Sequence, residues 1–284
     1  MAWTERDETV WNEIMSWEQD MLNYEGNDFQ YTYSKWLEAA FESIPEETRD
    51  SVFQRLDQML FHLHSLLQGS QVQSDARERI LVSARAFHEE INEIADLKKL
   101  TIDQLHYLNN QHSARHRLYS FVQGGVTGTS GLVTMAADFP AMVIINLRSV
   151  QLTALTYGYD VHIPFEMMTS LKVFHAAFLP NRLKVKGWSD LVTDLEDRDS
   201  LYFYNGSDKL TNSAWLEEPL KQALKLTAIS MFKNKKVSSI PLIGMAIGAG
   251  ANYQLTRKVT QYAERYYQYR YLFEKRKEEG IGNQ

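Results

Sequence analysis

The chain contains no cysteine among its 284 residues. This absence excludes disulfide bonds, thiolate nucleophiles and cysteine-ligated zinc or iron–sulfur centres, and it is typical of proteins in a reducing compartment. The first eight residues are acidic and lack the apolar segment of a signal peptide. We therefore expect a cytoplasmic protein.

Sequence signatures of common catalytic sites are also missing. Ser130 lies in a Gly-Thr-Ser-Gly segment at 128–131, but a nucleophile elbow needs a glycine two places after the serine and a strand before it. The segment 248–253 matches a dinucleotide-binding loop only in its first two glycines, and neither glycine-rich segment is followed by a Walker-type lysine. We therefore predict no catalytic residue and no cofactor.

The eight histidines do not indicate a metal site. His62 and His64 are two residues apart and point to different sides of a helix. His112 and His116 share a helix face, but the neighbouring arginines add positive charge that disfavours a cation. We predict neither a metal ion nor a nucleic-acid partner.

The main positive signal in the sequence is the helical periodicity of its apolar residues. Apolar residues recur three to four apart, and residues 1–110 show no alternating strand pattern. Gly69 and Gly158 are predicted helix ends. The predicted helix starts are the cap Thr4, Pro45, Ser74 and, for a short helix, Thr101, with a further helix at 165–178.

These helices predict an all-α fold. Residues 1–110 are an acidic helical region and residues 111–284 a helical core with a basic C-terminal helix, which we expect to form one continuous domain. The polar stretch 180–212 is predicted to be an exposed loop. An amphipathic helix with apolar residues between 216 and 232 should follow it.

Charge is distributed unevenly along the chain, whose net charge is −6. Residues 1–50 carry 13 acidic and three basic residues, whereas residues 221–277 carry 12 basic and two acidic ones. Two explanations stay open. The two ends can pack against each other, or the basic end can face anionic lipid.

Two weakly charged segments carry glycine at helical spacing. Residues 118–147 contain one charged residue, and residues 237–256 contain none. A glycine inside a helix costs about 1 kcal/mol relative to alanine, and the usual compensation is the close approach of another helix. The glycines that we assign to helix packing or membrane contact are Gly124, Gly128, Gly131, Gly244, Gly248 and Gly250.

Three surroundings fit these glycine-bearing helices: the protein core, a membrane interface or a full membrane span. Polar residues dilute both segments, so that a span is the least favoured. Basic residues flank the second segment, as expected at anionic headgroups. The tyrosines at 262–271 suit an interface or a half-buried helix face equally. The flanking bases are Lys233, Lys235, Lys236, Arg257 and Lys258.

Asp138 stands alone in the first weakly charged segment, and a buried carboxylate needs a partner. We predict that Asp138 caps a new helix, with Pro140 in its first turn. The alternative is that Asp138 pairs with a distant base or contacts a ligand. In that case the predicted polar binding site consists of Asp138, Arg148, Gln151 and Asn252.

The order of motifs resembles the central signature of the EcsC family. The matching residues are Gln123-Gly124-Gly125-Val126-Thr127-Gly128, Gly131-Leu132, Ala137-Asp138-Phe139-Pro140, Arg148, Gln151, Tyr157-Gly158-Tyr159-Asp160, Ile240-Pro241-Leu242-Ile243-Gly244, Gly248 and Asn252-Tyr253. The family is named after a bacterial ABC-transporter locus. The resemblance implies a bacterial intracellular protein at the membrane, as an accessory to a transporter, and it carries over no catalytic residues.

These observations lead to three functional hypotheses. The first is a non-enzymatic peripheral membrane protein whose partner is anionic lipid or a membrane protein complex. The second is a soluble module that binds a lipid or small molecule near Asp138 and Arg148. The third is an unrecognised hydrolase, which would need Ser130 to meet His112 or His116 in one cleft.

Overall fold

The computed structural model describes residues 2–24, 32, 35, 45–127, 132–196 and 240–280. These residues form helices and no strand, which confirms the all-α fold. The elements are α1 (Glu5–Leu22), α3 (Glu46–Gln68), α4 (Gln71–Arg85), the 3-10 helix η1 (Ile94–Lys99), α5 (Ile102–Thr127), α6 (Leu132–Thr156), α7 (Pro164–Phe178), α8 (Asn181–Glu196) and α10 (Ile240–Glu278).

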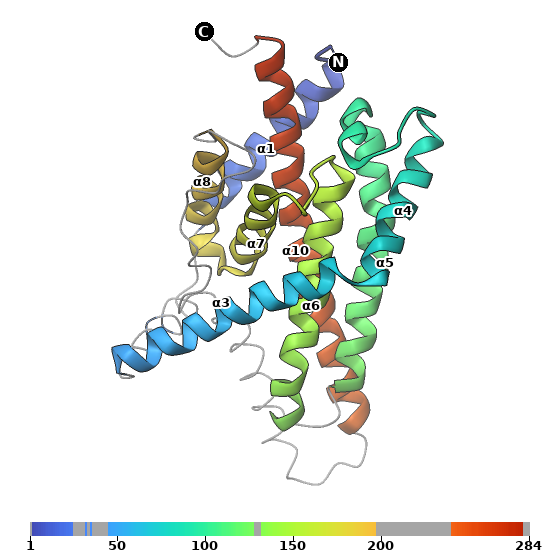
Figure 1. Ribbon diagram of the computed structural model, residues 1–284. Helices are drawn as coiled ribbons and strands as arrows, with labels where there is room; N and C mark the ends of the chain where they lie inside the picture. Colours follow the sequence, from blue (N-terminus) through green and yellow to red (C-terminus); the bar gives the residue numbers. More distant parts are fainter. Residues whose placement is uncertain are drawn as a thin grey trace.

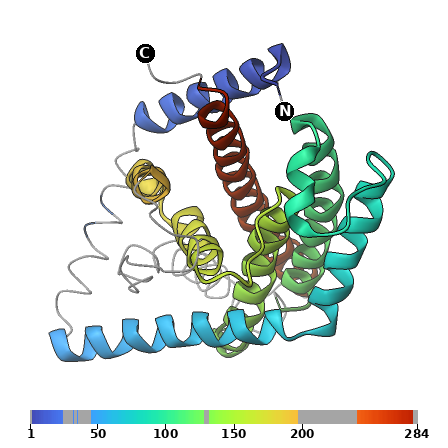
Figure 2. The same ribbon diagram turned by 45° about the horizontal axis from the view of Figure 1, so that its top comes forward.

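Three long helices, α5, α6 and α10, form the central bundle (Figure 1). The 39 residues of α10 make it about 58 Å long at 1.5 Å per residue. The helices α1, α7 and α8 lie beside the upper half of α10 in Figure 1, and α3 crosses the bundle lower down. Figure 2 shows α1 running across the C-terminal end of α10, with α4 beside α5. The lower ends of α5, α6 and α10 extend beyond the other described helices (Figure 1).

Several predicted helix ends are confirmed. The backbone N–H of Asp7 donates to Thr4 Oγ1 at 3.1 Å, and the Thr4 N–H donates to Asp7 Oδ2 at 2.8 Å, so Thr4 caps α1. Gly69 ends α3. Gly158 follows α6 with a φ of 85°, and a Cβ there would lie 2.7 Å from Lys98 Cγ. Only glycine fits this turn without strain.

The boundaries of α4 differ from prediction. It starts after the cap Ser70 rather than at Ser74, and it ends at Arg85. The apolar residues between 91 and 97 therefore reach the core from a loop and from η1. Their spacing resembled that of a helix because the 3-10 turn also repeats every three residues.

The helix at Thr101 is 26 residues long rather than short. Its apolar pattern is interrupted by Asn109, His112 and Ser113, which are nonetheless buried. Helical periodicity in the sequence is lost where polar side chains occupy core positions. Residue 110 lies inside α5, so this helix belongs to both regions distinguished in the sequence.

The predicted loop at 180–212 is wrong over its first half, because α8 occupies residues 181–196. The side chains of Trp188, Leu191 and Leu195 are buried at helical spacing. Their burial against neighbouring helices, including α1 and α7, outweighs the polar residues between them. The amphipathic helix predicted at 216–232 lies outside the described residues.

The prediction that Asp138 caps a new helix is also wrong. The helix α6 runs without a break from Leu132 to Thr156, and both Asp138 and Pro140 lie inside it. A proline there removes one backbone hydrogen bond and disturbs the preceding turn. Packing of α6 against α5 and α10 compensates for this loss.

The acidic and basic ends of the chain pair with each other where both are described. Lys275 Nζ donates to Asp7 Oδ2 at 2.7 Å in a buried contact, and Arg265 lies 3.5 Å from Glu13. Burial disfavours the charged Asp7 carboxylate, but hydrogen bonds from Lys275 and Thr4 outweigh it and lower its pKa. The intramolecular explanation of the charge asymmetry therefore holds for these residues.

The tyrosine series of α10 lies in the core. Tyr262, Tyr266, Tyr267, Tyr269 and Tyr271 are at most 7% exposed. Three of these rings, those at 262, 266 and 269, contact a buried tryptophan of α8 edge-on. Two of them also contact tryptophans of α1, one stacked and one edge-on. The half-buried helix face is therefore the correct explanation, and the membrane-interface explanation of these tyrosines is wrong.

A buried ion pair joins α7 to α10. The Arg270 guanidinium is fully buried and donates two hydrogen bonds of 2.5 Å to Glu166 and one of 3.1 Å to Glu274. It also lies 3.8 Å from the centre of the Tyr159 ring. Burial disfavours the charged guanidinium, but the attraction of Glu166 prevails and raises the pKa of Arg270.

Replacement of Glu166 by glutamine should destabilise the fold by about 3–5 kcal/mol, because Arg270 loses a buried counter-charge. Urea denaturation at constant m-value measures this loss. The control is E78Q, in an exposed carboxylate 3.6 Å from Arg85, and it should cost under about 0.5 kcal/mol. Equal effects of the two substitutions would contradict the expectation.

Candidate functional site

The lower ends of the three central helices carry almost no charge. We define the distal end as residues 118–127 of α5, 132–147 of α6 and 240–256 of α10 (Figure 1). Asp138 is the only charged residue in these three segments. The charge-poor stretches recognised in the sequence thus come together at one end of the bundle.

Hydrogen bonds set the register of α5 and α10 in the upper part of the distal end. Ser120 Oγ lies 2.6 Å from Thr256 Oγ1 and donates to the carbonyl of Asn252 at 3.1 Å. The helices are antiparallel, so Arg117 of α5 and Arg257 of α10 lie at one level. From this level residues 118–127 extend about 15 Å downward. The distal end is therefore a charge-poor tip with a basic boundary.

Apolar side chains are exposed on this tip. Leu118 is 59% exposed and Val122 is 56% exposed, and a spacing of four places them on one face of α5. Tyr119 and Tyr253 are exposed beside them. A groove of about 370 Å³ between α5 and α10 is lined by Ala114, Arg117, Leu118 and Tyr253. The tip thus offers apolar surface directly next to a guanidinium group.

The predicted lipid-facing bases lie partly within the described residues. Arg257 and Lys258 are exposed just above the tip, as is Arg115 on α5. The remaining predicted bases, at 233–236, lie outside the described residues. The basic boundary therefore includes residues from both α5 and α10.

The glycines assigned to helix packing or membrane contact lie in different places. Gly124 lies in the last turns of α5, and Gly244 and Gly248 lie in the first turns of α10. At Gly250 no atom of the described residues lies within 4 Å of the position that a Cβ would take, so none of these residues approaches it closely. Gly128 and Gly131 lie outside the described residues.

The described members of the predicted polar site do not form one network. Gln151 is fully buried, with its Nε2 2.8 Å from His64 Nδ1 and its Oε1 accepting from Gln73 at 3.4 Å. Arg148 donates to the carbonyl of Val72 on α4 at 3.0 Å. Asn252 instead lies at the contact between α5 and α10, where its carbonyl accepts from Ser120. The side chain of Asp138 lies outside what the structure describes.

A different cluster forms around His112. Arg79 of α4, Arg115 of α5 and Arg148 of α6 all act on this buried imidazole. Burial first, and the three guanidinium groups next, lower the pKa of His112 to about 4. Sequence reasoning found His112 beside Arg115, but the approach of Arg79 and Arg148 depends on tertiary packing that no local spacing reveals.

A polar cleft of about 500 Å³ lies between α1, α5 and α10. Its charged groups other than Arg117 are paired with one another: Arg6 donates to Asp103 at 2.9 Å, and His106 lies 2.7 Å from Glu264. The hydrogen bond with Glu264 raises the pKa of His106. Because these acids and bases neutralise each other, the cleft does not present an activated nucleophile.

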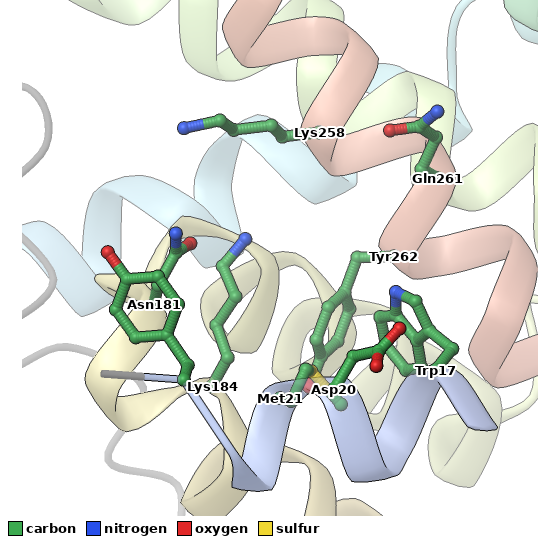
Figure 3. A pocket seen from close by; sticks show the side chains of 9 residues that line it. Trp17, Asp20, Met21, Asn181, Lys184, Lys258, Gln261 and Tyr262 are labelled. Carbon is green, nitrogen blue, oxygen red and sulfur yellow. The ribbon is translucent and has the colours of Figure 1, made fainter. Parts of the chain in front are cut away.

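A smaller cleft of about 240 Å³ lies between α1, α8 and α10. Figure 3 shows Lys184 and Lys258 extending toward it from α8 and α10, with Trp17 and Asp20 of α1 on the opposite wall. Both clefts are lined by residues other than Asp138, Arg148 and Asn252. The cavity expected for the second hypothesis is therefore not one of these two.

The described ranges contain neither a candidate metal site nor a helix that could span a membrane. No three histidine, aspartate or glutamate side chains among them are grouped so that they could hold a metal ion. None of the helices within those ranges is both long and apolar enough to cross a bilayer. Ser130 lies outside them, and the hydrolase hypothesis is not tested by the structure.

Buried histidines predict a pH-dependent stability. The pKa of His64, His112 and His175 is lowered from 6.5 to about 4, chiefly by burial. The unfolded chain therefore binds more protons than the folded one between these pH values, so stability falls as the pH falls through this window.

For H112Q the slope of unfolding free energy against pH should decrease by up to about 1.4 kcal/mol per pH unit in this window. The exposed His62 supplies the matched control, H62Q, which should retain the wild-type slope. Chemical denaturation at several pH values measures both. An unchanged slope in H112Q would contradict the lowered pKa, because it would show that His112 binds protons equally in the folded and unfolded chain.

Comparisons with known proteins agree with the resemblance seen in the sequence. The chain is 26% identical over 283 residues to the uncharacterized protein YdbA of Bacillus subtilis (strain 168), and the alignment covers 97% of each chain. No solved structure matches the chain. The model of the EcsC protein family matches residues 8–272, which is nearly the whole chain. This protein therefore belongs to the EcsC family.

Proposed function

We propose that the protein is a non-enzymatic, peripheral membrane protein that inserts its distal end into one leaflet of an anionic bilayer. The observation that carries this proposal is the exposure of Leu118 and Val122 on a charge-poor, three-helix tip bounded by basic residues. Exposed apolar patches of this kind mark interaction surfaces. The basic boundary favours an anionic membrane as the partner.

The dimensions of the tip suit one leaflet. Residues 118–127 extend about 15 Å beyond the level of Arg117, whereas the hydrocarbon core of a bilayer is about 30 Å thick. The tip would therefore reach about the bilayer centre without crossing it. Arg117 and Arg257 would then lie at the headgroups, where their charge is favoured.

The expected affinity is modest. Full burial of a leucine or valine side chain contributes about 1.5–3 kcal/mol, so two half-exposed side chains contribute about half of that each. Each basic residue near an anionic surface adds about 1 kcal/mol. The summed binding free energy is of the order found for a single myristoyl chain, which attaches reversibly. The share of the basic residues makes the attachment sensitive to salt.

A membrane transport complex is the alternative partner for the same surface. The EcsC family takes its name from an ABC-transporter locus, and a transporter would present both lipid and protein at the membrane. Binding to protein-free vesicles separates these partners. A protein that sediments with cell membranes but not with such vesicles would require a protein partner, and the lipid proposal would fail.

Replacement of Val122 by glutamate should reduce flotation with phosphatidylglycerol vesicles at least about tenfold, because a carboxylate would enter the apolar layer. The matched control is V82E on α4, where the valine is 55% exposed and lies on a helix that is not part of the tip. Both side chains are exposed in solution, so neither substitution should unfold the protein. Equal binding of the two variants would argue against insertion of the tip.

Charge reversal at Arg257 and Lys258 should weaken vesicle binding by about 2 kcal/mol or more, and the loss should shrink as salt is added. The control is K277E, which reverses one exposed charge at the opposite end of α10. Co-sedimentation at low and at physiological ionic strength measures the difference. A larger effect of K277E would place the membrane contact at the other end of the molecule.

A further inference from the structure

Three arginines from three different helices act electrostatically on His112, with no counter-charge among the described residues. They are Arg79, Arg115 and Arg148, from α4, α5 and α6. Burial first, and then repulsion by Arg79, lowers the pKa of Arg148. Within the described part of the chain, no carboxylate lies within 4.0 Å of any of these three guanidinium groups.

Other arginines of the same chain have a carboxylate partner. Those that pair with carboxylates include Arg6, Arg77, Arg85, Arg265 and Arg270. Like charges that gather without an opposite charge destabilise the fold. Arg79 and Arg115 are exposed and Arg148 is half-buried, so a bound anion would relieve the repulsion among them.

Buried polar atoms beside the arginines also lack partners. The Nε2 atom of His112, a residue only 8% exposed, makes no hydrogen bond with the described residues. The Nε atom of Arg148 is likewise buried without an acceptor, although its terminal nitrogen donates to the carbonyl of Val72. Native proteins satisfy nearly all such atoms, so an unfilled donor next to a cationic cluster is typical of a ligand site.

We propose that Arg79, Arg115 and Arg148, together with His112, bind a phosphate group, and that on the membrane this is the terminal phosphate of a lipid headgroup. Guanidinium groups match phosphate oxygens in shape and charge, and a dianion compensates more than one of them. Neutral His112 can donate from Nε2 to a phosphate oxygen in the appropriate tautomer.

The position of the cluster along the bundle fits a headgroup. His112 precedes Arg117 by five residues on α5, which places the cluster about 7 Å above the boundary of the tip. The headgroup layer on each side of a bilayer is about 5–7 Å thick. The lipid form of this inference rests on the proposed function, whereas the binding of free phosphate does not.

The main experiment uses the full chain and two probes. Inorganic phosphate is titrated by calorimetry, and vesicles that contain phosphatidic acid are compared with phosphatidylglycerol vesicles of the same zeta potential. The test variant is the double substitution R79Q/R115Q. The control R55Q/K277Q removes two exposed cations elsewhere. Both pairs are on the surface, so folding should be unaffected.

We expect the wild-type chain to bind phosphate and to prefer phosphatidic acid. R79Q/R115Q should weaken phosphate binding at least about tenfold and abolish the preference, since hydrogen bonds from charged groups are lost. Phosphate binding that depends on these arginines, without a lipid preference, would support the site and identify free phosphate compounds as the ligand source. Phosphate binding that is absent, or equal in the two double variants, would overturn the inference.

A second readout locates the anion. Bound phosphate should raise the pKa of His112 above its value of about 4, because it opposes the charge of the arginines. Imidazole NMR signals report this change. Saturation with phosphate and an unchanged His112 signal would place the anion elsewhere and overturn the inference. Loss of vesicle binding in V122E with intact phosphate binding would support insertion of the tip independently of the phosphate site.

Discussion

The packing of α10 against α5 and α6 is the contact on which the rest of the molecule depends. Over its C-terminal half, α10 is held by tyrosines in the core and by the buried pair between Arg270 and Glu166. Because a helix of about 58 Å is rigid on this scale, that anchoring also positions its N-terminal half. The bond between Ser120 and Thr256 then fixes α5 to α10 in the upper part of the tip.

This arrangement divides the molecule into two parts with different chemistry. Around the upper half of α10, acidic α1 and basic α10 neutralise each other through Asp7 and Lys275. Near the lower half, basic residues have no such counterpart within the described part of the chain, and Asp138 is the only charged residue of the tip beyond them. The same helix thus contributes its paired charges to the core and its unpaired ones to the surface that we assign to the membrane.

The sequence predicts the helices well wherever apolar spacing and caps agree, as at Thr4 and Gly158. It fails where tertiary packing overrides local signals: α6 continues through Pro140, and α8 forms in a stretch that reads as a polar loop. The candidate site follows the same rule. Charge-poor segments are visible in the sequence, but the meeting of Arg79 with Arg148 requires α4 to lie beside α6, and only the fold supplies that.

An acidic protein can bind an anionic surface only if its charge is polarised, and this chain meets that condition. From 104 to 127, 132 to 156 and 240 to 263, the central helices carry five basic residues and one acidic residue, despite a net charge of −6 overall. The acidic helix α1 lies at the far end of α10 (Figure 1). At physiological salt, electrostatic interactions decay over about 8 Å, so a bilayer at the distal end would experience the basic boundary and not the distant acids.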